Sequence, residues 1–314
     1  MKILFSADWH IKLGQRNVPK DWQVNRYKLL FEKLENITCD IHIVGGDIFD
    51  RKPTLEELEL FFEFVIGTKH KTLIYDGNHE ATKKGSTFLS YLDHVTFQAN
   101  PLVRIIDNYY EQDNFEIYPY CELDNLKTAK AKKTILFTHV RGEIAPHVKP
   151  ELDLDILDQW DIVVAGDLHS YSNCQRNILY PGSPVTTSFH RSKSKAGVIL
   201  FDTVTKEHEW IELDLPQLLR KTVSSEDEIV STDYHHTIYE VEGNVADLAK
   251  VKSNELIDKK VVNKTVDSKL SFSEEMTIQD ELSMYLKEQV NLTTDQIKEV
   301  NKVFNDYYSQ NGMG

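Results

Sequence analysis

The chain has 314 residues, of which 40% are hydrophobic and 27% are charged, with nine prolines. This is the composition of a folded globular protein, and the length predicts two domains with a sizeable core in the larger one. The net charge of −14 argues against a protein that wraps nucleic acid through a uniformly basic surface. The N-terminal apolar stretch is shorter than a signal sequence and no segment has about 20 uninterrupted apolar residues, so we expect a cytoplasmic protein without a membrane span.

Short β-rich apolar runs alternate with helical patterns through the first two thirds of the chain. The runs predict buried strands at residues 2–7, 41–46, 71–77, 133–139, 161–166 and 197–202. Between the first three runs, apolar residues recur at helical spacing in residues 26–36 and 54–67. This alternation predicts an α/β layered fold.

The segment between the first strand and the first helix is locally basic. Residues 11–28 contain Arg16 and four other Lys or Arg residues against one acid, Asp21, with Trp22 and Tyr27 interleaved. A loop that contacts a phosphate backbone needs this composition, but the start of a solvated amphipathic helix has it about as often. The sequence leaves both interpretations open.

The pattern changes after residue 214. Residues 215–270 are rich in acids and predict a small α+β domain, with a strand at 236–243, a helix at 245–257 and a strand at 259–267. We therefore predict a domain boundary at 214/215 and a second one at 270/271.

The C-terminal region, residues 271–314, predicts two helices. The second covers residues 293–310, where Thr294 is placed to cap it. Its apolar residues fall on one face at 3.6-residue spacing, and these are Ile297, Val300, Phe304 and Tyr307. Such a stripe either packs on its own domain or docks on a partner.

Polar side chains gather directly after the predicted strands, in five loops. They are Asp8 and His10, Asp47, Asn78 and His79, His139, and Asp167 and His169. Ligand sites of open α/β sheets lie beyond the carboxyl ends of the strands, so we expect these loops to converge. Within each Asp-x-His pair we expect both side chains on the same side of an extended segment, because residues i and i+2 share a face.

All of these residues except His79 are taken as ligands, and together they offer seven carboxylate, imidazole and amide groups. Seven ligands suffice for two metal ions if one carboxylate bridges them, and a set without thiolate suits manganese, iron, zinc or magnesium. Two cations roughly 3.5–4 Å apart activate water and clamp the attacking and leaving oxygens of a phosphoryl displacement. The residues alone therefore predict phosphoester hydrolysis.

The ordered motifs DxH, GDxxD, GNHE, a strand-end His and GxxH resemble those of the calcineurin-like metallophosphoesterases over about residues 1–205. Within that superfamily, ADWHIKLG, GGDIFDRKP and LYPGSPVTTSF are similar to the SbcD nuclease group, the DNA-repair subunits that work with an SbcC-type ABC ATPase. The resemblance implies a four-layer α/β/β/α nuclease domain at residues 1–214. It also implies a DNA-binding capping domain at 215–270 and helices at 271–314 that bind the ATPase.

The resemblance further divides the seven ligands between two divalent cations, manganese by preference and magnesium as the alternative. Asp8, His10, Asp47 and His169 would hold one cation, and Asp47 would bridge to a second completed by Asn78, His139 and Asp167. The family's usual last motif is GHxH, so Asp167 stands where its first His is expected. A carboxylate there is a harder and more anionic ligand.

Further roles follow from the same resemblance. His79 is similar to the family residue that helps to expel the leaving 3′ oxygen, although a hydrogen bond to a metal ligand would also explain it. Four arginines are candidate contacts to the DNA backbone, each of which also fits an ordinary surface position: Arg16, Arg51, Arg141 and Arg191. Members of the group form homodimers, and the apolar helix at 55–65 fits either that interface or burial against the sheet.

Three functions are compatible with the sequence. The first is a manganese-dependent DNA nuclease, a 3′–5′ exonuclease and single-strand endonuclease in an SbcC–SbcD-type repair and recombination complex. The second is a phosphomonoesterase or cyclic phosphodiesterase on the same metal site. The third is a protein-binding scaffold with a decayed centre, which the seven retained ligands and His79 disfavour and Asp167 leaves open.

Overall fold

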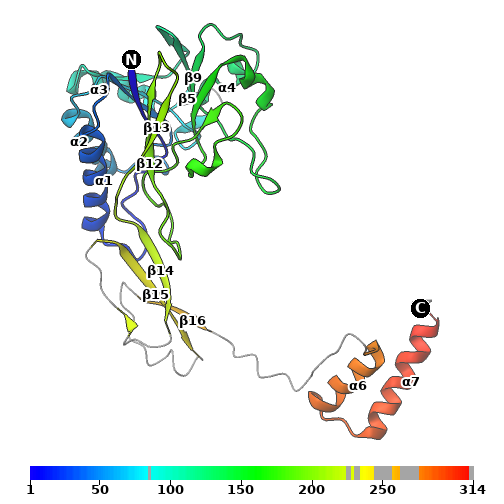
Figure 1. The fold of residues 1–314 in the computed structure, drawn as a ribbon. Coiled ribbons are helices and arrows are strands. Elements are labelled where there is room, and N and C mark those ends of the chain that lie inside the picture. The colour runs from blue at the N-terminus through cyan, green and yellow to red at the C-terminus, as the bar shows by residue number, and fades with distance from the viewer. Residues whose placement is uncertain (84–85, 224–227, 230–233, 244–256, 262–275, 311–314) are drawn as a thin grey trace. The chain divides into compact units, whose positions relative to one another are not determined.

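The computed structural model describes residues 1–83, 86–223, 228–229, 234–243, 257–261 and 276–310 (Figure 1). Two compact units make up the chain, one from Met1–Val241 with Ser253–Asp258 and the other from Glu242–Lys252 with Lys259–Gly314. The domain boundaries expected at residues 214 and 270 stay predictions. The helix expected at 245–257 lies, except for its last residue, outside the described residues.

A six-stranded sheet with the order β13-β12-β1-β2-β3-β6 forms one half of the larger unit. Its strands are β1 (Lys2–Ser6), β2 (Ile41–Gly45), β3 (Thr72–Tyr75), β6 (Val103–Ile106), β12 (Gly197–Asp202) and β13 (His208–Glu212). The strands β1, β2, β3 and β6 run parallel, with Ile3 opposite Ile41 and His42 opposite Thr72. This register brings the carboxyl ends of β1, β2 and β3 to the same edge of the sheet.

A five-stranded sheet with the order β11-β10-β9-β8-β7 forms the other half. Its strands are β7 (Tyr110–Gln112), β8 (Phe115–Tyr118), β9 (Ile135–His139), β10 (Ile162–Gly166) and β11 (Ile178–Leu179). All are parallel except β7, which pairs antiparallel with β8. The six strands predicted from the apolar runs are therefore confirmed, each to within two residues at either end.

The two sheets pack face to face between layers of helix. The helices α1 (Lys20–Glu35), α2 (Leu55–Gly67) and α3 (Asp93–Ala99) lie on the outer side of the six-stranded sheet, and α4 (Leu123–Leu126) lies on the far side of the other sheet (Figure 1). Phe5 of β1 faces Phe137 of β9 across the middle, whereas Leu4 faces the helices. Strands buried on both faces explain the continuous apolar runs, and the four-layer α/β/β/α fold is confirmed.

The remaining strands of the described residues form a hairpin and a small separate sheet. The strands β4 (Ala81–Lys83) and β5 (Ser86–Thr87) form a hairpin after the third loop of the site. A separate sheet has the order β14-β15-β16, and its strands are β14 (Leu218–Val223), β15 (His236–Gly243) and β16 (Ile257–Val261). The predicted strand 236–243 is confirmed, whereas residues 262–267 of the strand predicted at 259–267 lie outside the described residues.

The smaller unit contains the two predicted C-terminal helices, α6 (Ile278–Glu288) and α7 (Thr294–Gln310). The expected cap at Thr294 is wrong, because Thr293 caps α7. The Thr293 hydroxyl accepts from the backbone N–H of Gln296 at 3.4 Å, and the Gln296 side chain accepts from the Thr293 N–H at 2.9 Å. This reciprocal pair of hydrogen bonds requires a spacing of three residues, and of the two neighbouring threonines only Thr293 lies three residues before Gln296. In the described part of the chain, no helix is long and apolar enough to cross a membrane.

Candidate metal centre

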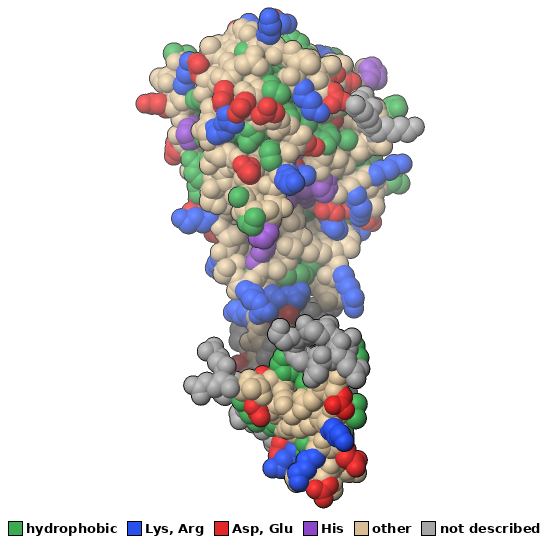
Figure 2. All heavy atoms as spheres, turned by 90° about the vertical axis from the view of Figure 1, so that its right-hand side faces the viewer, with side chains coloured by type: hydrophobic (Ala, Val, Ile, Leu, Met, Phe, Trp, Pro, Cys, Tyr) green, Lys and Arg blue, Asp and Glu red, His purple; other side chains and the backbone are tan. Residues whose placement is uncertain are grey.

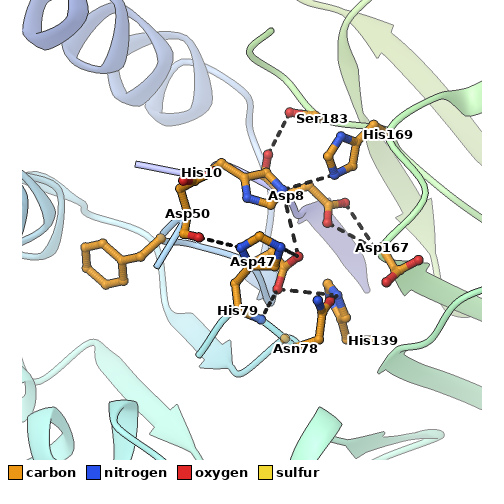
Figure 3. Close-up of polar contacts among 12 residues, drawn as sticks. Asp8, His10, Asp47, Asp50, Asn78, His79, His139, Asp167, His169 and Ser183 are labelled. Carbon is orange, nitrogen blue, oxygen red and sulfur yellow. Dashed lines mark hydrogen bonds and ion pairs between the residues drawn. The ribbon is translucent and has the colours of Figure 1, made fainter. Parts of the chain in front are cut away.

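The loops that follow β1, β2 and β3 of one sheet meet the loops that follow β9 and β10 of the other (Figure 3). Three groups of side chains have ligand atoms within 4.8 Å of one another, and they are Asp8 with His10 and His169, His10 with Asp47 and His79, and Asp8 with Asp47 and His139. Six of the eight residues predicted for the centre thus come together, and Asn78 contacts one of them. Their individual roles stay predictions.

The backbone of these loops is unusual, since four of the residues have positive φ angles. The angles are 57° at Asp8, 45° at His10, 50° at Asp47 and 100° at Asp167. The expectation that Asp8 and His10 lie on an extended segment is therefore wrong, because β1 ends at Ser6 and the chain turns. Two hydrogen bonds fix the turn, from Asp8 N–H to the Gly46 carbonyl at 3.0 Å and from His10 N–H to the Asp47 carbonyl at 2.9 Å.

Two glycines allow the loops to approach this closely. A Cβ atom on Gly77 would lie 2.2 Å from Oδ1 of Asp47, and one on Gly46 would lie 2.6 Å from Nδ1 of His139. Gly46 also has a φ of 86°, a conformation that side-chain-bearing residues rarely adopt. Gly46, directly before Asp47, therefore permits the close approach of this loop to His139.

His139 and Asp47 form the buried middle of the cluster. Nδ1 of His139 must donate to the Gly45 carbonyl, 2.9 Å away, because a carbonyl only accepts. Nε2 therefore faces Oδ1 of Asp47 at 3.5 Å and Oδ1 of Asn78 at 3.1 Å. Burial opposes charge on both groups, but their mutual attraction prevails and holds the pKa of His139 well above, and that of Asp47 below, the ordinary value.

The remaining ligand atoms suit a divalent cation. Burial raises the pKa of Asp8 to about 8, lowers the pKa of His10 to about 3 and lowers that of His169. Nε2 of His10 lies 3.0 Å from Nε2 of His169, and Nδ1 of His10 is buried without a hydrogen-bond partner. Burial thus favours unprotonated imidazoles at His10 and His169 and disfavours the ionised form of Asp8, which a bound divalent cation would stabilise. The residues present therefore fit the divalent cations that the sequence implied.

Asp167 differs from the other candidate ligands in where its carboxylate points. Both of its oxygens are 3.1 Å from the guanidinium of Arg141, in a bidentate ion pair. Its backbone N–H donates to the Asp8 carboxylate at 3.1 and 3.3 Å, whereas His169 reaches His10. The expectation that Asp167 and His169 lie on the same side is wrong, because β10 ends at Gly166 and the left-handed turn at Asp167 separates them.

Replacing Arg141 by glutamine is expected to raise the affinity for Mn²⁺. If Asp167 is a ligand, the guanidinium competes with the metal for its carboxylate. Arg141 is partly exposed, so solvent screens its interaction with Asp167. The free energy of such a screened ion pair corresponds to an increase in Mn²⁺ affinity of about two- to fivefold. Isothermal titration at fixed ionic strength measures it, with Arg176→Gln as the control, since Arg176 pairs with Asp155 at the surface. An unchanged affinity would remove Asp167 from the ligands.

The other three predicted DNA contacts have different surroundings. Arg51 forms a bidentate pair with the buried Glu57, at 2.8 and 3.2 Å. Arg191 pairs with the buried Glu240 at 2.9 Å. Arg16 is exposed, and no hydrogen bond or ion pair joins it to any described residue. Arg16 is thus the candidate with a free guanidinium, and contact with DNA stays a prediction for all four.

His79 presents one ring nitrogen to the cluster. Nδ1 donates to the Asp50 carbonyl at 2.6 Å, and the His79 backbone N–H donates to Oδ1 of Asp47 at 2.9 Å (Figure 3). Nε2 is left 3.9 Å from Oδ2 of Asp47, and about a third of the side chain is exposed. The sequence suggested a proton donor or a hydrogen-bonding neighbour. The geometry adds a third role, that of a ligand together with His10 and Asp47.

Comparison with known proteins identifies the family. The family model described as calcineurin-like phosphoesterase matches residues 1–201. The chain belongs to the calcineurin-like phosphoesterases. It is 44% identical over 314 residues to the probable exonuclease subunit 1 of Escherichia phage T5, covering 96% of each chain. It is 24% identical over 220 residues to the putative phosphoesterase 244L of Invertebrate iridescent virus 6, covering 63% of this chain and 75% of the relative.

Two solved structures are similar to this calcineurin-like phosphoesterase. An archaeal phosphodiesterase aligns with a TM-score of 0.39 at 16% identity, covering 68% of this chain and 100% of its own. The protein TT1561 of Thermus thermophilus aligns with a TM-score of 0.42 at 13% identity, covering 67% and 98%. The family match alone confirms the resemblance seen in the motifs.

Two further residues border the candidate centre, and the sequence motifs that contain them predict no role for either. Ser183 of the YPGSP motif places its hydroxyl 2.7 Å from the Asp8 carbonyl and 2.6 Å from that of Val185. Glu80 of the GNHE motif is fully buried behind the Asp47 loop. Burial, reinforced by the charge of Asp47, raises the pKa of Glu80 to about 8. The one feature of the sequence that could have indicated a role for them is their position beside the candidate metal ligands.

Proposed function

We propose that this phosphoesterase is a metal-dependent DNA nuclease, a 3′–5′ exonuclease and single-strand endonuclease. The observation that carries the proposal is its 44% identity, over 96% of both chains, to a phage T5 protein named as a probable exonuclease subunit. The cluster of histidines and aspartates is the second support, because its ligands fit divalent cations.

The proposed centre holds two divalent cations, with manganese preferred over magnesium. Asp8, His10, Asp47 and His169 would hold one of them. Asp47, Asn78, His139 and Asp167 would hold the other, with Asp167 shared between the cation and Arg141. Bound cations of this kind polarise the phosphoryl group and supply hydroxide at neutral pH. The protein's part is to fix these ligands: His139 by its bond to Gly45 and Asp8 by the N–H of Asp167.

His79 is the proposed proton donor to the leaving 3′ oxygen. Because Nδ1 is bonded to the Asp50 carbonyl, the ring exchanges a proton with substrate only at Nε2, which faces the cluster. A positioned general acid contributes about 10²- to 10⁴-fold to such a reaction.

Arg16 is the proposed contact to the DNA backbone that we choose for a test, because its guanidinium has no partner among the described residues. Replacing it by alanine is expected to raise KM several-fold with kcat unchanged, and to reduce the slope of log K against log salt by about 0.7–0.9 for the loss of one phosphate contact. Fluorescence anisotropy across a salt series measures the slope. Lys20→Ala is the matched control on the same segment, because Lys20 already pairs with Glu56 at 2.5 Å. Equal effects of the two variants would contradict a specific role for Arg16.

A second basic region supports a longer path for DNA. Two grooves beside β14 and β15, of about 460 and 340 Å³, share Arg191 and Lys221 in their walls. Figure 2 shows Lys and Arg side chains gathered at the narrow end of the larger unit. Lys221 belongs to the proposed capping domain, residues 215–270, and Arg191 to the proposed nuclease domain, residues 1–214, so DNA bound here would contact both.

Two apolar surfaces support the proposed partners. In the C-terminal unit, residues of α6 and α7 line a groove of about 570 Å³, and they include Leu282, Val300, Val303, Phe304 and Tyr307. We propose it as the surface for the SbcC-type ATPase of a repair and recombination complex. Leu55 and Ile66 of α2, 85% and 66% exposed, support a homodimer through that helix. The cytoplasmic location stays a prediction.

The deciding experiment is digestion of end-labelled DNA. Purified protein is incubated with linear duplex and single-stranded substrates in Mn²⁺, in Mg²⁺ and in chelator. The proposal expects metal-dependent shortening from 3′ ends. Hydrolysis of a chromogenic phosphate ester without any DNA cleavage would favour the phosphatase alternative. Neither activity, together with no Mn²⁺ binding, would favour the scaffold.

A further inference from the structure

Glu80 joins the loop after β2 to the loop after β3. Its carboxylate accepts three backbone hydrogen bonds. Oε2 accepts from the N–H of Asp47 at 2.9 Å and from that of Gly77 at 2.8 Å, and Oε1 accepts from the N–H of Phe49 at 2.9 Å. The side chain is fully buried, and it contributes no atom to the three groups of candidate metal ligands.

These three N–H groups need such a partner. The strands β2 and β3 end at Gly45 and Tyr75, so the residues beyond them have no ladder of hydrogen bonds along the sheet. Buried N–H groups without a partner are costly, and the two oxygens of this one side chain accept from all three. A single oxygen, Oε2, accepts from the N–H groups of both Asp47 and Gly77 and so holds the two loops at a fixed separation. Because Asn78 directly follows Gly77, this contact also sets the distance between Asp47 and Asn78.

We propose that Glu80 is a positioning residue, which fixes Asp47 relative to Asn78 and thereby sets the affinity of the centre for divalent cations and the rate of hydrolysis. It touches neither the cation nor the DNA. The inference rests on the proposed metal centre, but not on DNA as the substrate.

Glu80→Gln is the informative substitution, because it keeps the shape and removes one acceptor. In one orientation the amide NH₂ faces the Phe49 N–H, and in the other it faces the N–H groups of both Asp47 and Gly77. Either way a donor meets a donor. We expect the Mn²⁺ affinity to fall about 10- to 100-fold, as for other partners of metal ligands, and kcat to fall with it while KM for DNA stays within twofold. Glu80→Asp keeps both acceptors and is expected to retain more affinity than Glu80→Gln.

Glu116 offers a matched control in the same unit. It lies on β8, is also fully buried, and also accepts three hydrogen bonds, from the Tyr109 hydroxyl at 2.9 Å, the Lys132 N–H at 3.2 Å and the indole of Trp160. It belongs to none of the three ligand groups. Glu116→Gln makes the same chemical change away from the centre, so it is expected to lower Tm without changing Mn²⁺ affinity.

The test is a titration of metal-free full-length protein with Mn²⁺, at a temperature well below the Tm of each variant. Calorimetry and the spectroscopic signal of bound Mn²⁺ both measure the affinity. A Glu80→Gln protein with reduced Tm but wild-type affinity and kcat would overturn the inference and leave Glu80 a purely structural role. If Glu80→Gln does not fold, Glu80→Asp is titrated beside Glu116→Asp, and wild-type affinity in the former overturns it equally. Absence of Mn²⁺ binding by the wild-type protein would overturn it together with the metal centre. Absence of DNA cleavage alone would overturn only the proposed substrate.

Discussion

Replacing Asp47 by asparagine is expected to abolish tight Mn²⁺ binding and to lower DNA cleavage by at least about a thousandfold, or about 4 kcal/mol in the activation free energy. Asp47, like Asp8, belongs to two of the three ligand groups, and its carboxylate faces His139 at 3.5 Å on one side and His10 at 3.8 Å on the other. Asparagine removes its charge but tolerates the left-handed backbone, with φ of 50°, better than alanine would. Cleavage of end-labelled DNA and Mn²⁺ titration measure the two losses.

The control for Asp47→Asn is the same substitution at Asp113. That residue is an exposed aspartate with a φ of 47°, in the turn between β7 and β8, so the chemical change and the backbone requirement are alike. Asp113→Asn is expected to bind Mn²⁺ and to cleave DNA like the wild type. Wild-type cleavage by the Asp47→Asn protein would place the catalytic centre elsewhere on the molecule.

Replacing His79 by alanine is expected to lower the cleavage of ordinary DNA by about 10²- to 10⁴-fold while leaving the number of bound Mn²⁺ ions unchanged. The reason is the proposed role of Nε2, the ring nitrogen not held by the Asp50 carbonyl, as the proton donor to the leaving oxygen. A p-nitrophenyl ester of thymidine 5′-phosphate has a leaving group that needs no proton. The variant is therefore expected to hydrolyse this ester at close to the wild-type rate.

Two outcomes would separate the possible roles of His79. Loss of bound Mn²⁺ would make it a ligand together with His10 and Asp47, which its geometry also permits. Equal loss of activity on DNA and on the p-nitrophenyl ester would contradict the role of proton donor. His147→Ala, which changes an exposed histidine outside the ligand groups, controls for general effects of the substitution.

The strands could be predicted because each of them is buried on both faces. In β1, Leu4 faces the helices while Ile3 and Phe5 face the second sheet, so the run has no polar interruption. The end of a helix depends on finer detail. At α7, two neighbouring threonines have equal intrinsic propensity to cap, and only the reach of Gln296 back to Thr293 distinguishes them.

The sequence could predict which residues gather at the centre, but not how they are oriented. Parallel pairing within each sheet brings the loop of Asp8 next to that of Asp47, and His139 next to the loop of Asp167. The packing of the two sheets against each other then joins the two sets. The pair of Arg141 with Asp167 joins residues 26 positions apart in two different loops, and no local pattern indicates it. The same is true of Glu80, whose donor on Asp47 lies 33 positions away.

Four residues of the centre have left-handed backbone conformations, and at these positions the residue type that favours stability differs from the one that favours activity. Asp8, His10, Asp47 and Asp167 each occupy a conformation that costs a side-chain-bearing residue on the order of 1 kcal/mol or more relative to glycine. Four such positions amount to a sizeable share of the roughly 5–15 kcal/mol by which a domain is stable. A chain selected for heat resistance alone would therefore exchange them for glycine and lose the proposed metal ligands. A more thermostable form of this enzyme has to gain its stability elsewhere, in the helices and in the core between the sheets.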